Sequence, residues 1–303
     1  MADNVDNLEL RLKRRVAEFL QAKGHRQALH PTLGEIFKRG WGGCIFGGTL
    51  RDLALFGMRR DPHDLDIVVS RLTPELESYL RPHITKRTRF GGVQACIGHW
   101  DLDIWALHDT WAFRERLIGP AAFQDLPKTT FLNVQAVAVQ VLPSGQLGRV
   151  FESGFFQSIC DRTIDINFEA NPFPRFCALN ALTTAYKLDF ALAPRLVDYV
   201  LRHVGHSDLS DLCDYQSRRY GRVVFGYDRL RGWIELLAEE HRKDPSSVIH
   251  LPRPATIQRQ FPWSMEASML AQEPFGDDRE EWIPDVASDD ASPVSSRSNR
   301  LFE

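Results

Sequence analysis

The stretch that decides the fold is GGTLRDLALFGMRRDPHDLDIVV, residues 47–69. It opens with paired glycines, continues as the helical pattern LRDLALFG, and ends in DLDIVV, a short apolar run typical of a buried strand. Another such run, CIFGG at 44–48, leads into the glycines, and LDIWAL at 102–107 repeats the strand pattern. Strands that alternate with helical segments predict an α/β (α+β) fold built on a small mixed sheet.

Helices are expected before and inside this unit. Residues 5–23 place apolar side chains at three- and four-residue steps, which indicates an amphipathic helix. A second helix is expected over 31–39, ending at Gly40. Farther along, Thr73 followed by Pro74 predicts a capped helix start.

The chain after this unit turns helical. Residues 129–152 alternate apolar and polar side chains around Pro-Ser-Gly at 143–145, which predicts a hairpin. Helical periodicity then covers 176–192 and 193–205 and returns over 211–243.

We therefore divide the chain into four parts. These are N-terminal helices over 1–40, a head domain over 41–170, a helical neck and body over 171–250, and a Pro-rich and acidic tail over 251–303. The tail carries few large apolar residues, so we expect it to be largely disordered.

Composition excludes several classes of protein. A chain of 303 residues that is 43% hydrophobic and 25% charged can bury a core, which excludes a wholly disordered or collagenous protein. Five cysteines without a CxxC pair argue against a disulfide framework and a Cys-based zinc site. No apolar run approaches the ~18 residues that a bilayer crossing needs, so we expect a cytoplasmic protein that does not bind membranes. The net charge of −3 means that a polyanion would have to meet a local basic face.

Two acidic residues mark the candidate site. In an extended strand, side chains at alternate positions share a face, so Asp64 and Asp66 point the same way. Adjacent carboxylates repel each other unless cations lie between them, as in sites that hold two divalent ions for phosphoryl transfer. The alternative is a pair of aspartates exposed at a strand edge, and a lone Asp-x-Asp more often means that.

The upstream glycines favour the metal interpretation. Gly47 and Gly48 stand between a strand and a helix, where backbone N–H groups can approach a triphosphate. Arg51 lies one helical turn later and can reach the same phosphates. A third carboxylate is expected from residues 99–107, where Asp101 and Asp103 share one face; we favour Asp103, in mid-strand, and leave Asp101 open.

These motifs resemble the head domain of poly(A) polymerases and CCA-adding tRNA nucleotidyltransferases, within the DNA polymerase beta superfamily. GGTLRD is similar to the family's glycine motif, and HDLDIVV to its Asp-x-Asp strand. KTTFLNVQA resembles a later motif through Asn133, with Lys128 at an arginine position. Residues 172–190 are similar to the neck helix.

The resemblance implies specific roles. Gly47, Gly48, Arg51, Lys128 and Asn133 would bind the nucleoside triphosphate. Two Mg²⁺ ions would be held by Asp64, Asp66 and Asp103, which are also the expected catalytic residues. Asp52 is expected to be structural, paired inside the fold.

The neck departs from the family pattern. Asn180 and Thr183 stand where arginines would read the incoming base, and only Lys187 keeps a positive charge. The sequence therefore leaves the choice of NTP open.

Two further patterns have functional and structural interpretations. Residues 215–231 interleave arginines with aromatic residues, which is typical of RNA binding or, equally, of a solvated helix face. His203 and His206 form an HxxH, which we interpret as surface histidines rather than metal ligands because no cysteine or HExxH accompanies them.

The sequence as a whole predicts a Mg²⁺-dependent nucleotidyltransferase that transfers a nucleoside monophosphate to an acceptor hydroxyl. An RNA 3′ end, tRNA first, is the expected acceptor. Two alternatives remain: a toxin-like or defence enzyme that modifies a protein or tRNA, and a non-catalytic nucleotide- or RNA-binding module. The oligomeric state stays open.

Overall fold

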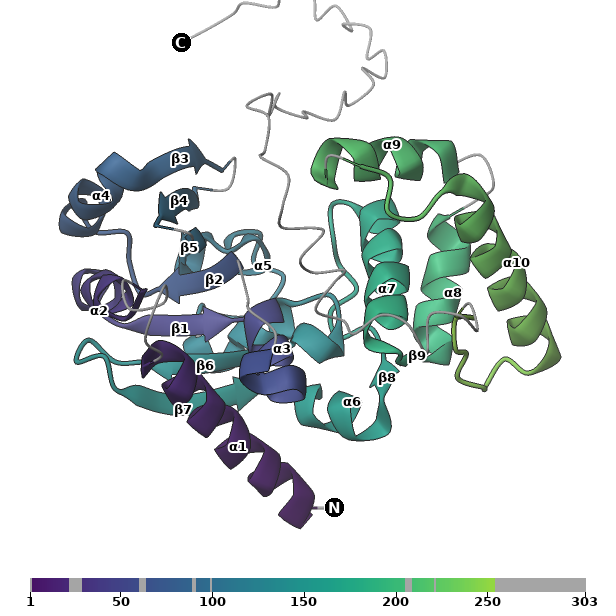
Figure 1. The fold of residues 1–303 in the computed structure, drawn as a ribbon, viewed down its shortest axis with the longest axis horizontal. Helices are drawn as coiled ribbons and strands as arrows, with labels where there is room; N and C mark the ends of the chain where they lie inside the picture. The colour runs from purple at the N-terminus through teal and green to yellow at the C-terminus, as the bar shows by residue number, and fades with distance from the viewer. Residues whose placement is uncertain are drawn as a thin grey trace, which may run out of the picture. The chain divides into compact units, whose positions relative to one another are not determined.

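The computed structural model describes residues 2–21, 29–59, 64–88, 91–98, 100–204, 209–220 and 222–253 (Figure 1). The described residues belong to one compact unit. The expected disordered tail lies outside the described residues from 254 onward, and the division of the remainder at 40 and 170 stays a prediction.

The elements follow the chain in this order. The helices are α1 (Ala2–Gln21), α2 (Leu29–Arg39), α3 (Gly48–Phe56), α4 (Pro74–Leu80), α5 (Trp111–Arg114), α6 (Phe155–Asp161), α7 (Pro174–Leu188), α8 (Pro194–His203), α9 (Leu209–Tyr220) and α10 (Tyr227–Lys243). The strands are β1 (Gly43–Phe46), β2 (Asp64–Val69), β3 (Ile84–Arg87), β4 (Val93–Ile97), β5 (Trp100–Ala106), β6 (Val137–Val141), β7 (Leu147–Glu152), β8 (Thr163–Ile164) and β9 (Ala191–Leu192). Short 3-10 turns include η2 (Gly57–Arg59), η4 (Leu107–Asp109) and η5 (Phe123–Thr129).

The head is built on a mixed sheet, as the sequence predicts. Its seven described strands run in the order β3-β4-β5-β2-β1-β6-β7. β2 and β5 are parallel, while the other neighbouring pairs are antiparallel. The predicted hairpin is confirmed, since β6 and β7 pair across the turn at 143–145.

The two faces of this sheet differ. One face joins α1–α4 and α6 in a large core that includes Ile45, Leu65, Ile67, Leu102 and Ile104. The other face carries a smaller apolar cluster, which is built from Cys44, Val68, Leu107, Phe113, Leu126 and Ala138. This second face is therefore only partly occupied by packing.

The helical part has its own core. α7–α10 bury a cluster in which Leu182, Val197 and Trp233 are almost completely inaccessible. Phe131 and Ile164 from the head range join this cluster, so the two parts share apolar contacts.

Several boundaries differ from the predicted ones. The first helix ends at Gln21 within the described residues, and the second begins at Leu29 rather than at residue 31. α7 stops at Leu188, because Asp189 adopts a left-handed conformation (φ 59°) and Ala191–Leu192 pairs with β8 as a short strand. The expected helical stretch 211–243 is two helices, α9 and α10.

The predicted cap of α4 is confirmed. The Thr73 hydroxyl accepts a hydrogen bond from the Leu76 N–H at 3.1 Å, and Pro74 occupies the first helical turn. Such a cap satisfies a backbone donor that the helix itself leaves open.

Candidate active site

The parallel pairing of β2 with β5 brings the predicted acidic residues together. Asp64 is in register with Asp101, and Asp66 is in register with Asp103. Side chains alternate along each strand, so all four aspartates lie on the face opposite the large core. Neighbouring strands lie about 4.8 Å apart, so each register pair places two carboxylates side by side.

Burial separates the two register pairs. Asp64 and Asp101, at the beginning of their strands, are exposed, whereas Asp66 and Asp103 are half-buried. A half-buried carboxylate has fewer rotamers and a more constant position than an exposed one. Asp103, and not Asp101, is thus the carboxylate in register with Asp66.

The diglycine bend lies directly beside Asp66. Gly47 has φ 75° and ψ −130°, a conformation that a residue with a side chain rarely adopts. A Cβ atom on Gly47 would come within 3.3 Å of Asp66 Oδ2. The Gly47 N–H donates to the Val137 carbonyl at 3.0 Å, which ties the bend to β6. The backbone angle therefore favours glycine strongly, and a side chain at this position would also displace the Asp66 carboxylate.

Helix α3 begins at this bend. Gly48 is its first residue, and the first-turn N–H groups of any helix lack intrahelical acceptors and favour an anion. A Cβ on Gly48 would lie 3.8 Å from an Arg51 guanidinium nitrogen, so the Arg51 side chain extends along this first turn.

Arg51 is held in place by its neighbour. Its Nε donates to Asp52 Oδ1 at 2.7 Å, and only 15% and 18% of the two side chains are exposed. The predicted structural pairing of Asp52 is confirmed. The pair fixes a guanidinium beside Gly48, where it can meet a phosphate without first losing rotamer freedom.

The donor set fits Mg²⁺ by its chemistry, since carboxylate oxygens are the protein ligands that this ion takes. Within the described residues, however, no group of three or more His, Cys, Asp or Glu side chains converges closely enough to hold a metal ion. The acidic face thus offers register pairs rather than a closed cage. Mg²⁺ commonly uses one or two carboxylates plus substrate phosphates, and this face suits that mode.

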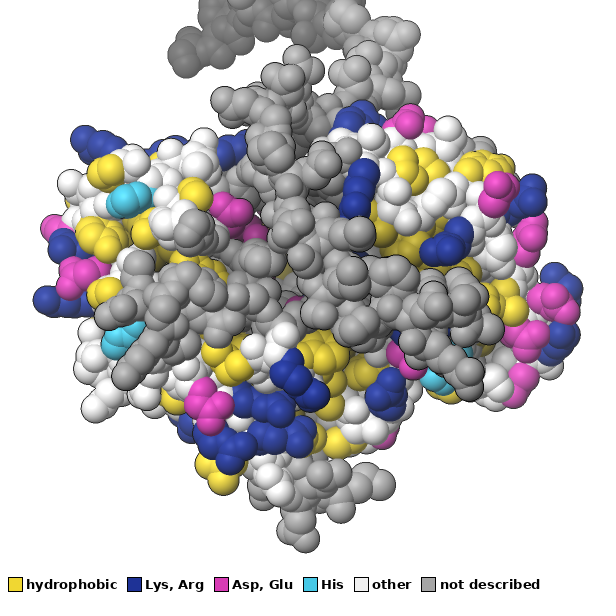
Figure 2. All heavy atoms as spheres, in the orientation of Figure 1, with side chains coloured by type: hydrophobic (Ala, Val, Ile, Leu, Met, Phe, Trp, Pro, Cys, Tyr) yellow, Lys and Arg dark blue, Asp and Glu magenta, His cyan; other side chains and the backbone are white. Residues whose placement is uncertain are grey.

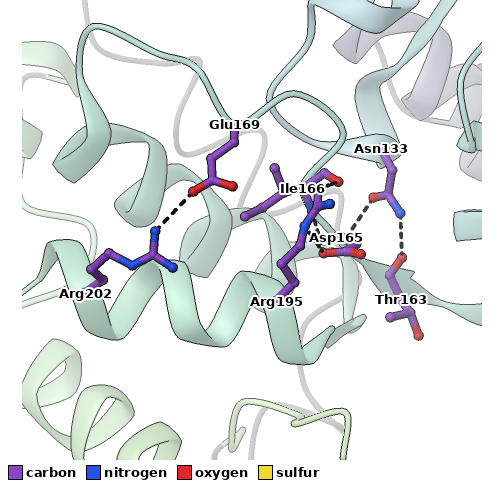
Figure 3. A network of polar contacts seen from close by, with 7 residues as sticks. All are labelled: Asn133, Thr163, Asp165, Ile166, Glu169, Arg195 and Arg202. Carbon is purple, nitrogen blue, oxygen red and sulfur yellow. Dashed lines mark hydrogen bonds and ion pairs between the residues drawn. The ribbon is translucent and has the colours of Figure 1, made fainter. Parts of the chain in front are cut away.

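Asn133 binds backbone rather than facing the acids. Its Oδ1 accepts from the Asp165 N–H at 3.0 Å, and its Nδ2 donates to the Thr163 carbonyl at 3.5 Å (Figure 3). Arg195, from α8, donates to the Ile166 carbonyl and lies 3.8 Å from Asp165 (Figure 3). Asn133 therefore joins the head to the segment that leads into the neck.

Lys128 lies on η5 and is mostly exposed. Its Nζ donates to Asp125 Oδ1 at 2.7 Å, a contact three residues back along the same turn. The structure does not bring Lys128 or Asn133 into contact with the aspartates, and their expected role toward the nucleotide stays a prediction.

The neck positions on α7 differ in exposure. Asn180 is exposed and Thr183 is buried, while Lys187 is half-buried. Asn180 Oδ1 accepts from the Thr184 hydroxyl at 3.4 Å.

The arginine–aromatic stretch is used largely for packing. Phe225 is only 3% exposed, and Tyr215 stacks on Phe176 with ring centroids 3.8 Å apart. Arg229 lies over the Tyr186 ring at 5.7 Å. The side chains of Arg219 and Tyr220 lie outside the described residues. The packing of Phe225, Tyr215 and Arg229 favours the structural interpretation of the stretch.

Of the HxxH histidines, His206 lies outside the described residues, as does His63 before the Asp-x-Asp strand.

Two features of the head are missing from the sequence prediction. β3 and β4 extend the sheet, and Gln94 on β4 is in register with Asp103, on the acidic face. The alternation in VQACI, residues 93–97, is the signal that could have found β4.

The second feature is a basic patch, which we define as Arg11, Arg14, Arg15 and Arg59. Figure 2 shows Lys and Arg side chains gathered over α1. Burial lowers the pKa of Arg15, and the nearby charges of Arg11, Arg14 and Arg59 lower it further. Because Arg59 comes from η2, the patch exists only in the folded chain. It is a local basic face of the kind that a polyanion partner requires.

Comparisons with known proteins give distant likenesses. No family model and no curated protein matches the chain. A tRNA nucleotidyltransferase solved with a primer tRNA and an incoming ATP analog is 21% identical over 70% of this chain and 60% of its own, with a TM-score of 0.47. A tRNA-processing enzyme is 23% identical over 70% and 55%, with a TM-score of 0.44. A CCA-adding enzyme solved with CTP is 13% identical over 78% and 62%, with a TM-score of 0.44. The chain thus spans less than two thirds of these proteins.

No helix within the described residues is long and apolar enough to span a bilayer.

Proposed function

We propose that this chain is a Mg²⁺-dependent nucleotidyltransferase that moves a nucleoside monophosphate from an NTP to the 3′ hydroxyl of an RNA, tRNA being the first candidate. The observation that carries the proposal is the in-register pairing of Asp66 with Asp103 beside Gly47. A binding module gains nothing from adjacent carboxylates, which repel each other and cost stability.

The diglycine bend would hold the triphosphate. The absence of a side chain at Gly47 and Gly48 lets phosphate oxygens approach the first-turn N–H groups of α3. Arg51, already oriented by Asp52, would donate to the same oxygens. Tight positioning of the triphosphate is itself a large part of catalysis in phosphoryl transfer.

The acidic face would orient the reacting groups. Asp64, Asp66 and Asp103 would hold Mg²⁺, which supplies neutralisation of the phosphate charge when it is bound. Because the described carboxylates form pairs and no cage, we expect weak Mg²⁺ binding to the protein alone and much tighter binding when NTP is present. Isothermal titration with and without a non-hydrolysable NTP measures this difference.

Asp103 would also handle the acceptor proton. The acceptor hydroxyl oxygen attacks the α-phosphorus, its proton passes to a carboxylate, and the bond to pyrophosphate breaks. Asp103 is the choice for the base because it is half-buried and adjacent to Asp66. Asn133 would act indirectly, by fixing residues 163–165.

One experiment separates the possible acceptors. The purified chain is incubated with each α-labelled NTP and Mg²⁺, with and without total RNA. Label on RNA supports the proposal, and label in a tRNA-sized band identifies the RNA. Label on protein indicates the toxin-like alternative. No transfer with any NTP, together with retained NTP binding, indicates a non-catalytic module.

A further inference from the structure

The turn between α2 and β1 has a tryptophan at a backbone position that glycine normally occupies. The Gly40 N–H donates to the Ile36 carbonyl at 2.8 Å, and the Gly42 N–H donates to the Phe37 carbonyl at 2.6 Å. The bond from Gly42 is the six-residue closure typical of a Schellman turn, whose left-handed position is normally glycine. Here Trp41 occupies it with φ 62°, although glycines stand on both sides. For a bulky residue this backbone conformation is an outlier.

The turn holds the Trp41 indole out of the protein. Trp41 is 60% exposed. Its carbonyl accepts a hydrogen bond from the Ser70 hydroxyl at 3.0 Å, and the Arg71 N–H donates to the Gly40 carbonyl at 3.3 Å. The Arg71 guanidinium lies over the indole, 5.1 Å from the ring centroid. The exposed ring is therefore fixed in position rather than left loose.

Two hollows are lined in part by residues that contact or adjoin this turn, Ser70 and Arg71 in one and Arg39 in the other. One, of about 550 Å³, is lined by Ser70, Arg71, Leu107, His108 and Ala121. The other, of about 450 Å³, is lined by Arg39, Pro74, Glu75, Ser78 and Tyr79. Volumes of about 300–1,000 Å³ are usual for sites that take small molecules or single groups of a larger ligand. A second arginine–aromatic pair borders the second hollow, because Arg39 lies 5.0 Å over the Tyr79 ring.

We propose that Trp41, Arg71 and the two hollows form a second binding site, for single-stranded RNA. Bases would stack on the exposed indole, and arginines would meet the phosphates. The charge of the lining favours RNA over an uncharged protein anchor, since Arg71 lines the first hollow and Arg39 lines the second together with Glu75.

The position of the site agrees with an RNA that also reaches the acids. Asp66 and Val68 share one face of β2, and Ser70 directly follows the end of this strand. Four residues along a strand span about 13 Å. In Figure 1 the turn lies where α2 passes into β1, at the end of the sheet away from α3. The site would thus hold RNA upstream of its 3′ end.

A circular RNA tests this site apart from the proposed enzyme activity. A circular oligouridylate has no 3′ end, and its binding is measured by fluorescence anisotropy without NTP. We expect Trp41→Gly to weaken binding about tenfold, as the loss of one stacked base would do. Trp41→Phe keeps an aromatic ring and should bind within about threefold of the wild type. Val248→Ala is the matched control, because Val248 is 50% exposed in the helical part.

Stability separates binding from misfolding. Because glycine favours the left-handed position, Trp41→Gly should melt at the same temperature as the wild type or higher. Arg71→Ala is an independent variant. It should weaken binding, and it should reduce the slope of the logarithm of the binding constant against the logarithm of the salt concentration by about one.

The proposal is wrong if Trp41→Gly and Arg71→Ala both bind the circular RNA as the wild type does, whatever their transfer activity. It is equally wrong if only binding of a protein partner is lost. If Trp41→Gly and Arg71→Ala lose circular RNA binding while neither they nor the wild type transfers NMP, the enzyme proposal is refuted and this proposal stands.

Discussion

The acidic face of the sheet and the helix pair α9–α10 both carry residue types typical of nucleotide enzymes, yet they use them in opposite ways. On the sheet, Asp66 and Asp103 are in register on neighbouring strands, where two carboxylates repel each other. On the helices, Phe225 is buried and Tyr215 stacks on Phe176, which adds stability. Residues whose placement does not favour the folded state are the better candidates for function.

The largest expected effect follows from the acidic face. Asp66→Asn and Asp103→Asn should each lower NMP transfer about a thousandfold or more, since a fixed electrostatic group near the reacting atoms is removed. Thermal stability should stay the same or rise, because a like-charge repulsion disappears. Steady-state transfer assays and thermal melts of the purified variants measure both quantities.

Asp64→Asn and Asp101→Asn show how much each aspartate of the acidic face contributes to NMP transfer. The exposed pair should lose less activity than the half-buried pair, and Asp101→Asn should lose least. Full activity in the Asp64→Ala and Asp66→Ala double variant would refute the enzyme assignment.

The next largest effect is expected between α9 and α10, where removing a buried aromatic side chain should lower the stability of the fold. Phe225 packs on Trp233 and Tyr186, with ring centroids 4.9 Å and 5.2 Å away. Phe225→Ala should destabilise the protein by about 3–5 kcal/mol, the usual cost of emptying a buried aromatic site. Urea denaturation measures this cost.

Arg222→Ala is the matched variant, because Arg222 is exposed in the same stretch. It should change stability by less than about 0.5 kcal/mol. If Arg222→Ala instead weakened RNA binding strongly while Phe225→Ala folded normally, the helices would be the RNA surface and the comparison would be reversed.

A smaller effect is expected at the bend. Gly47→Ala should cost about 1–3 kcal/mol of stability, because φ 75° with ψ −130° is a conformation that residues other than glycine rarely adopt. It should also lower transfer, since the new Cβ would lie 3.3 Å from Asp66 Oδ2.

Gly145→Ala is its control. Gly145 has φ 82°, but a Cβ there would meet nothing within 4 Å. Both variants should lose stability in thermal melts, and only Gly47→Ala should lose transfer. Equal activity in the two would mean that the bend is merely a turn.

The head was predictable because its signals are local. The Asp-x-Asp strand, the diglycine and the Thr73 cap each act within a few residues, and the structure places the acids and the bend together. The partner of Asp66 was also within reach, since apolar residues flank Asp103 on both sides.

What the sequence could not predict depends on contacts distant along the chain. The basic patch needs Arg59 beside α1, and the register of Gln94 with Asp103 needs the whole sheet. Asp189 ends α7 early because the following residues pair with β8, and helical periodicity does not show that competition. Trp41 gives no sequence signal, because what sets it apart is its backbone angle and its exposure in the folded chain.

The smallest expected effect is a pH dependence in the helical part. His203 ends α8, and its ring centroid lies 4.4 Å from that of Tyr199. Burial lowers the pKa of His203, the charge of Arg202 lowers it further, and Glu169 opposes both. The unfolded chain, with an ordinary histidine pKa of about 6.5, therefore takes up this proton more readily than the folded protein.

Stability from neutral His203 should thus be fully present above about pH 6.5 and should decline as the pH falls through that value. His203→Asn should flatten the decline, as measured by urea midpoints over this pH range. A steeper decline in the variant would mean that folding favours the charged imidazole. A metal-binding His203 would instead make wild-type stability sensitive to a chelator at neutral pH, whereas a histidine kept neutral by packing leaves it unchanged. The helical part would then differ from the acidic face in a second respect, because its histidine is kept neutral by packing while the sheet places carboxylates side by side.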